Sequence, residues 1–166
     1  QLCLMTAQIA NGGYKIYPKI VLNNNDNKSR IDKFAPLYKY SKNIKIVQKA
    51  MFSSTNEVRG TSYRSRIEDP KYQFAGKTGT AQVKRITKED RELDLKTFEI
   101  PYEERDHALY IAYVPYKNPR YAISILIEHG GSGGTVAAPL AKKLFKKIID
   151  RHEIRKNFET KKYLDI

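Results

Sequence analysis

The chain has 166 residues, of which 40% are hydrophobic and 30% charged, and its formal net charge is +13 at pH 7. This length suits one domain or a piece of a larger one, and the apolar content excludes a disordered chain. No run of 18 apolar residues occurs, which excludes a transmembrane helix within the sequence. The single cysteine excludes an intrachain disulfide, and the three histidines lie too far apart for a zinc motif. We therefore expect no metal site and no cofactor.

The excess of Lys and Arg is spread over most segments of the chain and forms no recognisable nucleic-acid-binding motif. A basic domain can bind nucleic acid or an anionic membrane surface. Because the charges are scattered, we interpret them as a solvated basic surface and expect no nucleic-acid partner.

The first third of the chain predicts two helices. Residues 1–10 carry apolar residues at spacings of three and four, and Asn11-Gly12-Gly13 ends this helix with a left-handed cap. A second helix is predicted over residues 44–54, again from apolar residues on one face. The sequence between them predicts an extended segment at 14–22 and a polar loop at 23–30.

The middle of the chain predicts three strands. Residues 108–114 and 121–127 are apolar and β-rich, and the polar turn at 116–120 between them predicts a β-hairpin buried on both faces. Another strand is predicted over residues 72–84. The densely charged residues 85–106 predict a solvated loop or a short exposed helix, with a mobile flap as the alternative.

A glycine-rich link at residues 128–134 precedes the last helix. The link lacks the Walker pattern, so we expect a flexible connection and not a phosphate loop. A helix is predicted over 136–150, and the tail from residue 151 is expected to fray. Its apolar residues form two rows: Leu140, Leu144 and Ile148, then Ala141, Phe145 and Ile149. Three antiparallel strands with packed helices make an α+β fold.

The predicted strand at 72–84 contains an unusual polar run, Gly76-Lys77-Thr78-Gly79-Thr80. Glycine weakens a strand interior and packs nothing, so two glycines here indicate that something lies close to the backbone. Lys77 offers a positive charge and the two threonines offer hydroxyls. Free N–H groups along such an edge can hold a carboxylate or a developing oxyanion. The alternative is an ordinary strand that bears a lysine.

The order of several motifs resembles the class B penicillin-binding proteins, and most of all the cell-elongation transpeptidases of the penicillin-binding protein 2 type. Lys77-Thr78-Gly79 matches the Lys-Thr-Gly motif of these enzymes and of serine β-lactamases. The likeness covers nearly the whole chain. The other segments that carry it are Gln1-Leu2 with Ala10-Asn11-Gly12-Gly13 and Pro18, the hairpin from His107-Ala108 to Glu128-His129-Gly130, and Ala137-Ala138-Pro139.

The resemblance also identifies what this sequence lacks. No Ser-x-x-Lys, the motif of the family's serine nucleophile, occurs in residues 1–166. Ser41-Lys42-Asn43 and Ser54-Thr55-Asn56 match the family's second motif by letter, but they follow the Ala-Asn-Gly-Gly turn and so stand in the wrong order. We interpret both as unrelated to catalysis. Residues 1–166 are thus expected to be the C-terminal portion of one transpeptidase domain with the penicillin-binding protein/serine β-lactamase-like fold.

The resemblance implies a peptidoglycan D,D-transpeptidase that crosslinks stem peptides through a serine acyl-enzyme and binds penicillin. It implies that Lys77 and Thr80 are catalytic and that Lys77, Thr78, Gly79 and Thr80 bind substrate, with the Thr80 N–H as one oxyanion donor. This portion alone is expected to be inactive. A structural role is expected for Glu128 and His129, and a turn at Gly60-Thr61.

The partners implied are peptidoglycan stem peptides, β-lactams, the upstream half of the domain and a membrane-embedded glycan polymerase. The implied location is the periplasmic face of the bacterial inner membrane, with an anchoring helix outside these residues. Two alternatives remain from the sequence: a piece of a serine β-lactamase or β-lactam sensor, and a basic non-catalytic binding module.

Overall fold

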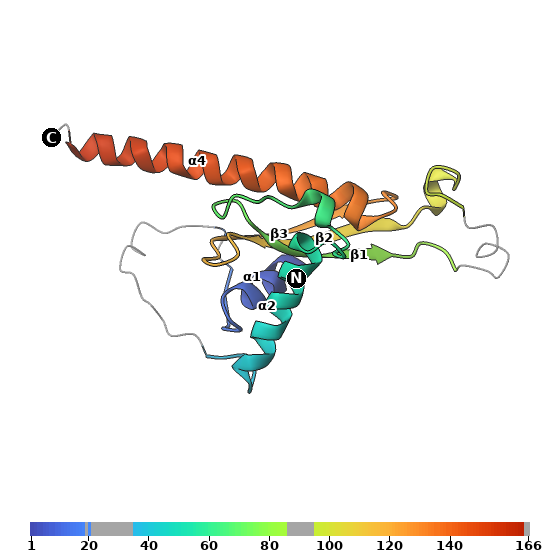
Figure 1. The fold of residues 1–166 in the computed structure, drawn as a ribbon, viewed down its shortest axis with the longest axis horizontal. Coiled ribbons are helices and arrows are strands. Elements are labelled where there is room, and N and C mark those ends of the chain that lie inside the picture. The colour runs from blue at the N-terminus through green and yellow to red at the C-terminus, as the bar shows by residue number, and fades with distance from the viewer. Residues whose placement is uncertain (19, 21–34, 86–94, 165–166) are drawn as a thin grey trace.

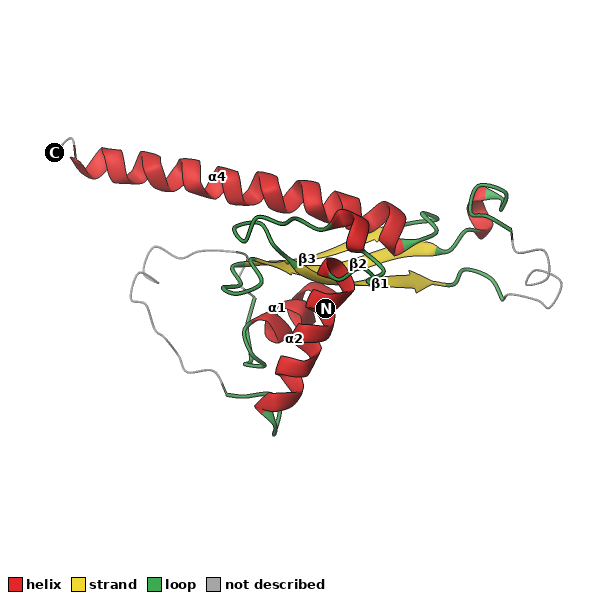
Figure 2. Ribbon diagram, viewed as in Figure 1, coloured by secondary structure: helices red, strands yellow, loops and turns green. Residues whose placement is uncertain are grey.

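The computed structural model describes residues 1–18, 20, 35–85 and 95–164, with the backbone alone from residue 155. Its central layer is a sheet of three antiparallel strands in the order β1 (Ala75–Ala81), β2 (His107–Val114) and β3 (Tyr121–Ile127). Helix α4 (Ala138–Leu164) covers one face of this sheet, and helices α1 (Leu2–Ala10) and α2 (Ser41–Asn56) lie on the other side (Figure 1; Figure 2). The α+β class and the predicted hairpin are therefore confirmed.

The observed strands agree with the predicted ones except at the ends of β1. The prediction extended from residue 72 to 84, whereas β1 pairs with β2 only from Ala75 opposite Tyr113 to Ala81 opposite His107. Because β2 begins at His107, the residues that follow Ala81 have no partner strand to pair with.

A separate hydrophobic cluster packs on each face of the sheet. Beneath α4, the fully buried residues include Phe74, Tyr110 and Phe145, and the aromatic rings of Phe74 and Phe145 lie 5.4 Å apart. On the other face, Tyr113 is buried together with Met51 and the C-terminal residues of α1. Two buried faces explain why the β2 sequence is almost continuously apolar.

Both N-terminal helices are confirmed, and α1 ends as the sequence predicts. Gly12 and Gly13 adopt positive φ angles of 94° and 91°, and the Asn11 side-chain oxygen accepts hydrogen bonds from the N–H groups of Gly13 and Tyr14. Helix α2 (Ser41–Asn56) is longer than the predicted 44–54, because the residues added at both ends are polar and do not continue the apolar pattern. The predicted polar loop at 23–30 and part of the extended segment at 14–22 lie outside the described residues.

The glycine-rich link is more closely packed than the expected flexible connection. It leads into a short π-helix (Gly133–Ala137) that lies against the sheet. A Cβ at Gly133 would lie 2.2 Å from the backbone oxygen of Leu109 and 2.7 Å from that of Gly79. Only glycine fits at this approach.

Helix α4 extends past the predicted end at residue 150 to Leu164, and Figure 1 shows it running beyond the edge of the sheet. Contacts with the rest of the chain support its middle: Lys71 Nζ lies 2.6 Å from a Glu153 carboxylate oxygen, and the His152 ring contacts Tyr121. Fraying of the tail stays a prediction. Of the two apolar rows, Ala141, Phe145 and Ile149 are buried, whereas Leu140 and Leu144 are exposed.

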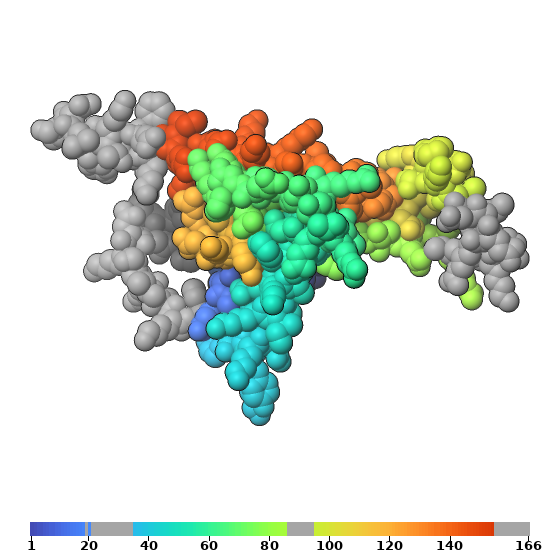
Figure 3. Space-filling model, viewed as in Figure 1, coloured from blue at the N-terminus to red at the C-terminus, as the bar shows by residue number. Residues whose placement is uncertain are grey.

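The charged segment that follows β1 contains a short 3-10 helix (Tyr102–Glu104), which agrees with the predicted short exposed helix. In Figure 3 the described part of this segment stands out at one end of the molecule. Residues 86–94 lie outside the description, and the flap alternative stays a prediction.

Candidate active site

Lys77 lies in the middle of β1 with its side chain exposed. Its Nζ donates to the backbone oxygen of Thr78 at 2.8 Å and lies 3.4 Å from the Thr78 hydroxyl. The ammonium group is therefore held against the outer edge of its own strand.

The outer edge of β1 presents backbone N–H groups that do not pair with β2. The Gly76 N–H donates to Thr55 Oγ1 at 3.1 Å, and the Phe74 oxygen accepts from Asn56 Nδ2 at 2.9 Å. The backbone polar groups of Gly76 and Phe74 therefore point away from β2. In an extended strand, residues two positions apart direct their N–H groups to the same side. The N–H groups of Thr78 and Thr80 consequently point to this outer edge, where an oxyanion donor is expected.

The two glycines of the polar run have different surroundings, so glycine is needed at each for a different reason. A Cβ at Gly76 would lie 2.3 Å from the Tyr110 hydroxyl oxygen, so Gly76 makes room for a side chain of the neighbouring strand. A Cβ at Gly79 would meet only Leu109 Cβ, at 3.3 Å. The close approach that the sequence predicts is thus made by Tyr110 at Gly76, whereas a side chain at Gly79 would meet a milder but still tight contact.

A buried hydroxyl network fixes β1 against the end of α2. The Tyr110 hydroxyl lies 3.0 Å from Thr55 Oγ1 and 3.0 Å from Ser62 Oγ, and these two oxygens lie 3.2 Å apart. Burial raises the pKa of the Tyr110 hydroxyl, and its hydrogen bonds to Ser62 and Thr55 lower that pKa in part. Since Thr55 Oγ1 also accepts from Gly76 N–H, the network determines where the Lys77 strand lies.

One residue beside the Lys77 motif, Thr61, is predicted from the sequence only as part of a turn. Thr61 Oγ1 lies 3.0 Å from Thr78 Oγ1 and 3.2 Å from Ser54 Oγ. The predicted turn at Gly60-Thr61 is present, because the Gly60 N–H donates to the Glu57 oxygen at 2.8 Å. Gly60 indicates the turn, but nothing in the local sequence indicates that the neighbouring Thr61 hydroxyl reaches β1.

A family model described as penicillin binding protein transpeptidase domain matches residues 1–146. The chain belongs to the penicillin-binding protein transpeptidase family. The resemblance inferred from the motifs is thereby confirmed.

Named relatives and solved structures agree with this family. The chain is 32% identical over 162 residues to the peptidoglycan D,D-transpeptidase MrdA of Salmonella typhimurium strain SL1344, covering 90% of the chain and 24% of that protein. It is 34% identical over 151 residues to MrdA of Acinetobacter baumannii, covering 87% and 21%. The chain therefore spans about a quarter of the length of these relatives.

Among solved structures, the complex between penicillin-binding protein PBP2 and MreC from Helicobacter pylori matches with a TM-score of 0.66 and 30% identity over 89% of the chain and 24% of that protein. PBP2 of Pseudomonas aeruginosa in complex with WCK 5153 matches with a TM-score of 0.59 and 27% identity, covering 86% and 28%.

In this transpeptidase family member, the two Ser-x-Asn sequences lie at opposite ends of α2. Ser41 and Asn43 lie in the first turn of α2, at the end of that helix that points away from the sheet (Figure 1). Asn56 is close to β1, but its side-chain amide donates to the backbone oxygens of Phe52 and Phe74. Its role is thus to attach α2 to the start of β1.

His129 and Glu128 lie in the link beyond β3. His129 has a positive φ of 54°, its N–H donates to His107 Nδ1 at 2.9 Å, and its own Nδ1 lies 3.1 Å from the Arg105 oxygen. Glu128 is exposed. These contacts join the start of the link to the start of β2, which fits the expected structural role of His129.

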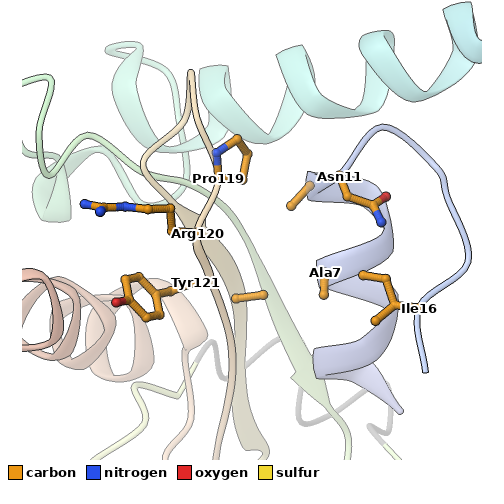
Figure 4. Close-up of a pocket in the computed structure, with 8 residues that line it drawn as sticks. Ala7, Asn11, Ile16, Pro119, Arg120 and Tyr121 are labelled. Atoms are coloured by element: carbon orange, nitrogen blue, oxygen red, sulfur yellow. The ribbon is translucent and has the colours of Figure 1, made fainter. Parts of the chain in front are cut away.

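A cavity of about 160 Å³ lies away from the Lys77 strand, between the end of α1, the following segment and the β2–β3 turn. Figure 4 shows Ala7 and Asn11 on the helix facing Pro119 at the turn, with Ile16 close to Ala7. Its lining is largely apolar, and none of its residues belongs to the Lys77 motif.

Within the described residues, no helix is long and apolar enough to cross a membrane, and no three His, Cys, Asp or Glu side chains gather as a metal site requires.

Proposed function

We propose that this chain is part of a peptidoglycan D,D-transpeptidase that crosslinks cell-wall stem peptides through a serine acyl-enzyme. The observation that carries the proposal is the outer edge of β1, where the Lys77 ammonium group lies beside the N–H groups of Thr78 and Thr80. The family match and the transpeptidases among its relatives support it. They favour it over a β-lactamase, a β-lactam sensor or a non-catalytic module.

The serine nucleophile is supplied by a part of the domain outside residues 1–166, since no Ser-x-x-Lys occurs here. In the first step this serine attacks the carbonyl of the D-Ala-D-Ala bond, and the terminal D-Ala leaves. In the second step the amine of another stem peptide attacks the acyl-enzyme and releases the serine. Penicillin enters the same groove and acylates the same serine.

This chain contributes the positive and hydrogen-bonding side of the groove. The Lys77 ammonium group attracts the terminal carboxylate of the stem peptide, and the hydroxyls of Thr78 and Thr80 donate to it. The Thr80 N–H donates to the oxyanion that forms during attack, and the loss of one such donor typically raises a barrier by about 3 kcal/mol. Gly79 leaves the strand surface free of a side chain on which the peptide can lie.

The partners proposed for the complete protein are stem peptides, β-lactams, the upstream half of the domain and a membrane-embedded glycan polymerase. The proposed location is the periplasmic face of the inner membrane, with an anchoring helix outside these residues. These proposals follow from the resemblance to cell-elongation transpeptidases, of which this chain spans about a quarter.

The test is covalent labelling of the full-length protein by a fluorescent penicillin. We expect a stoichiometric band for the wild type and none for Lys77→Ala, because Lys77 makes no core contact and its removal takes a charge from the groove. Lys117→Ala, which removes another exposed lysine in the β2–β3 turn, is the matched control and should label normally. An unlabelled wild type would overturn the proposal, and a labelled Lys77→Ala would overturn the role of Lys77.

A further inference from the structure

Three exposed hydroxyls form a continuous chain that ends at the Lys77 strand. Ser54 Oγ lies 3.2 Å from Thr61 Oγ1, which lies 3.0 Å from Thr78 Oγ1, and Thr78 Oγ1 lies 3.4 Å from Lys77 Nζ. The first two residues come from the end of α2 and the following turn. The chain of hydroxyls therefore connects a segment without a proposed catalytic role to the substrate-binding edge of β1.

The backbone of the Thr61 turn is closely packed on both sides, so the position from which the Thr61 side chain extends is fixed. A Cβ at Gly60 would lie 2.3 Å from the Ser54 oxygen, and a Cβ at Gly134 would lie 2.5 Å from the Thr61 oxygen. The Ser62 N–H also donates to the Ser54 oxygen at 3.0 Å. Two glycines and a backbone hydrogen bond thus hold the turn in the place where the Thr61 hydroxyl reaches Thr78.

We propose that Thr61 is a positioning residue, which orients the hydroxyl of Thr78 so that its hydrogen is available to the carboxylate of the substrate. A threonine hydroxyl has one hydrogen and two acceptor positions. The Lys77 ammonium group can only donate to it, and Thr61 donates to the second position. Both acceptor positions are then occupied, and the hydrogen is left for a ligand. This inference rests on the proposed function.

The direction of the hydroxyl chain follows from the ligand. A carboxylate has no hydrogen to give and can only accept. When it binds at Thr78, the hydroxyls align in one order: Ser54 donates to Thr61, Thr61 donates to Thr78, and Thr78 donates to the carboxylate. Without Thr61, the Thr78 hydroxyl can rotate and direct its hydrogen elsewhere.

The experiment measures the second-order rate constant for acylation of the full-length protein by a fluorescent penicillin that bears a free carboxylate. Thr61→Val keeps the branched shape and removes the hydroxyl. We expect it to slow acylation roughly three- to tenfold, the effect of one neutral hydrogen bond. Thr61→Ser restores the hydroxyl and should acylate at nearly the wild-type rate.

Double variants separate positioning from a structural effect. In a Thr78→Val background, Thr61→Val should cause no further loss, because there is no hydroxyl left to orient. In a Thr80→Val background, which is the matched control, Thr61→Val should retain its full effect. An equal loss in both backgrounds, or an unchanged rate in Thr61→Val, would overturn the inference.

Ser54→Ala provides a second variant that leaves the Thr61 turn intact. It removes the first donor of the chain and should slow acylation about twofold, a smaller effect because Thr61 can still donate to Thr78. If Thr61→Val does not fold, an unchanged rate in Ser54→Ala overturns the inference. If the wild type itself is not acylated, the proposed function fails and this inference with it. If the wild type is acylated but the variants do not show the expected rates, this inference alone fails.

Discussion

The hydroxyl of Tyr110 lies 3.0 Å from the hydroxyl of Thr55 in the interior of the molecule. Tyr113 is equally buried on the same strand but faces the other side of the sheet, and its hydroxyl has no hydrogen-bond partner among the described residues. One strand thus carries one satisfied and one unsatisfied buried tyrosine. The cost of burying a polar group depends on whether it is paired, so the two side chains should contribute differently to stability.

We predict opposite effects for the two conservative substitutions in the full-length protein. Tyr110→Phe should destabilise the domain by about 1–2 kcal/mol, because it removes the hydroxyl that joins Thr55 to Ser62. Tyr113→Phe should leave stability unchanged or raise it, since it removes only an unpaired polar group. The midpoint of thermal unfolding for the three proteins checks this. A larger loss for Tyr113→Phe than for Tyr110→Phe would contradict the account.

The same two tyrosines predict how stability depends on pH in alkaline solution. Burial raises the pKa of both hydroxyls above the ordinary value of 10.0, and for Tyr113 a nearby Tyr116 adds to the effect. Above pH 10 the unfolded chain therefore releases protons that the folded chain retains, so the free energy of unfolding falls as pH rises. This contribution is fully present below pH 10 and is lost progressively above it.

Thermal unfolding midpoints between pH 8 and pH 11.5 test this dependence. We expect the midpoint of the wild type to decline above pH 10 and that of Tyr113→Phe to decline less steeply, because the substitution removes one of the groups with a raised pKa. Absorbance near 295 nm, which reports tyrosinate, should rise together with unfolding. Parallel declines in the two proteins would refute the assignment to Tyr113.

The two glycines of the Lys77 motif allow a second matched pair of substitutions. Gly76→Ala places a methyl group on the Tyr110 hydroxyl and should destabilise the domain by about 1–3 kcal/mol, which lowers the unfolding midpoint by several degrees. Gly79→Ala brings a methyl group within 3.3 Å of Leu109 Cβ and should lower the midpoint less than Gly76→Ala does. It should nevertheless slow labelling by penicillin, because the methyl group occupies the surface on which the peptide is proposed to lie. Normal labelling of a stable Gly79→Ala protein would show that this surface is not used.

The sequence predicts the helices and strands of this fold better than it predicts why individual residues stand at their positions. The hairpin and the buried row of α4 depend on local periodicity, which one sequence shows directly. The reason for Gly76 is a tyrosine on the neighbouring strand, and Thr61 meets Thr78 only because a turn packs against β1. Such contacts join residues far apart in the chain, so a local pattern cannot reveal them. The Lys77 motif can be recognised from the sequence because its residues match a family motif.

The last prediction concerns the outer edge of β3. The backbone N–H of Gly76 points away from β2, so alternate residues of β1 direct their N–H groups toward β2. By the register between β2 and β3, the N–H groups of Tyr121, Ile123 and Ile125 then point toward β2. The N–H groups of Ser124 and Leu126 consequently point outward. Cys3 of α1 contacts the outward oxygen of Ala122. The described residues supply no further strand beyond β3. An apolar edge of this kind is a template for another strand.

The upstream half of the domain is the proposed partner of this edge and of the exposed residues Leu140 and Leu144 on α4. We expect residues 1–166 alone to be unlabelled by fluorescent penicillin, and to form a larger species in sizing chromatography when the upstream half is supplied. Leu126→Lys should weaken this association, because Leu126 is 54% exposed and a charge there opposes strand pairing. Ile125 is unsuitable for the test, since its side chain packs against the core beneath α4.

Val58→Lys is the matched control for this experiment, because Val58 is 78% exposed and follows α2, outside the β3 edge. It introduces the same charge and should leave the association intact. The association should also restore labelling by penicillin, since the upstream half is proposed to bring the serine to Lys77. If residues 1–166 remain a stable monomer that ignores the upstream half, or if Val58→Lys weakens the association as much as Leu126→Lys does, the edge of β3 is not where the two halves meet.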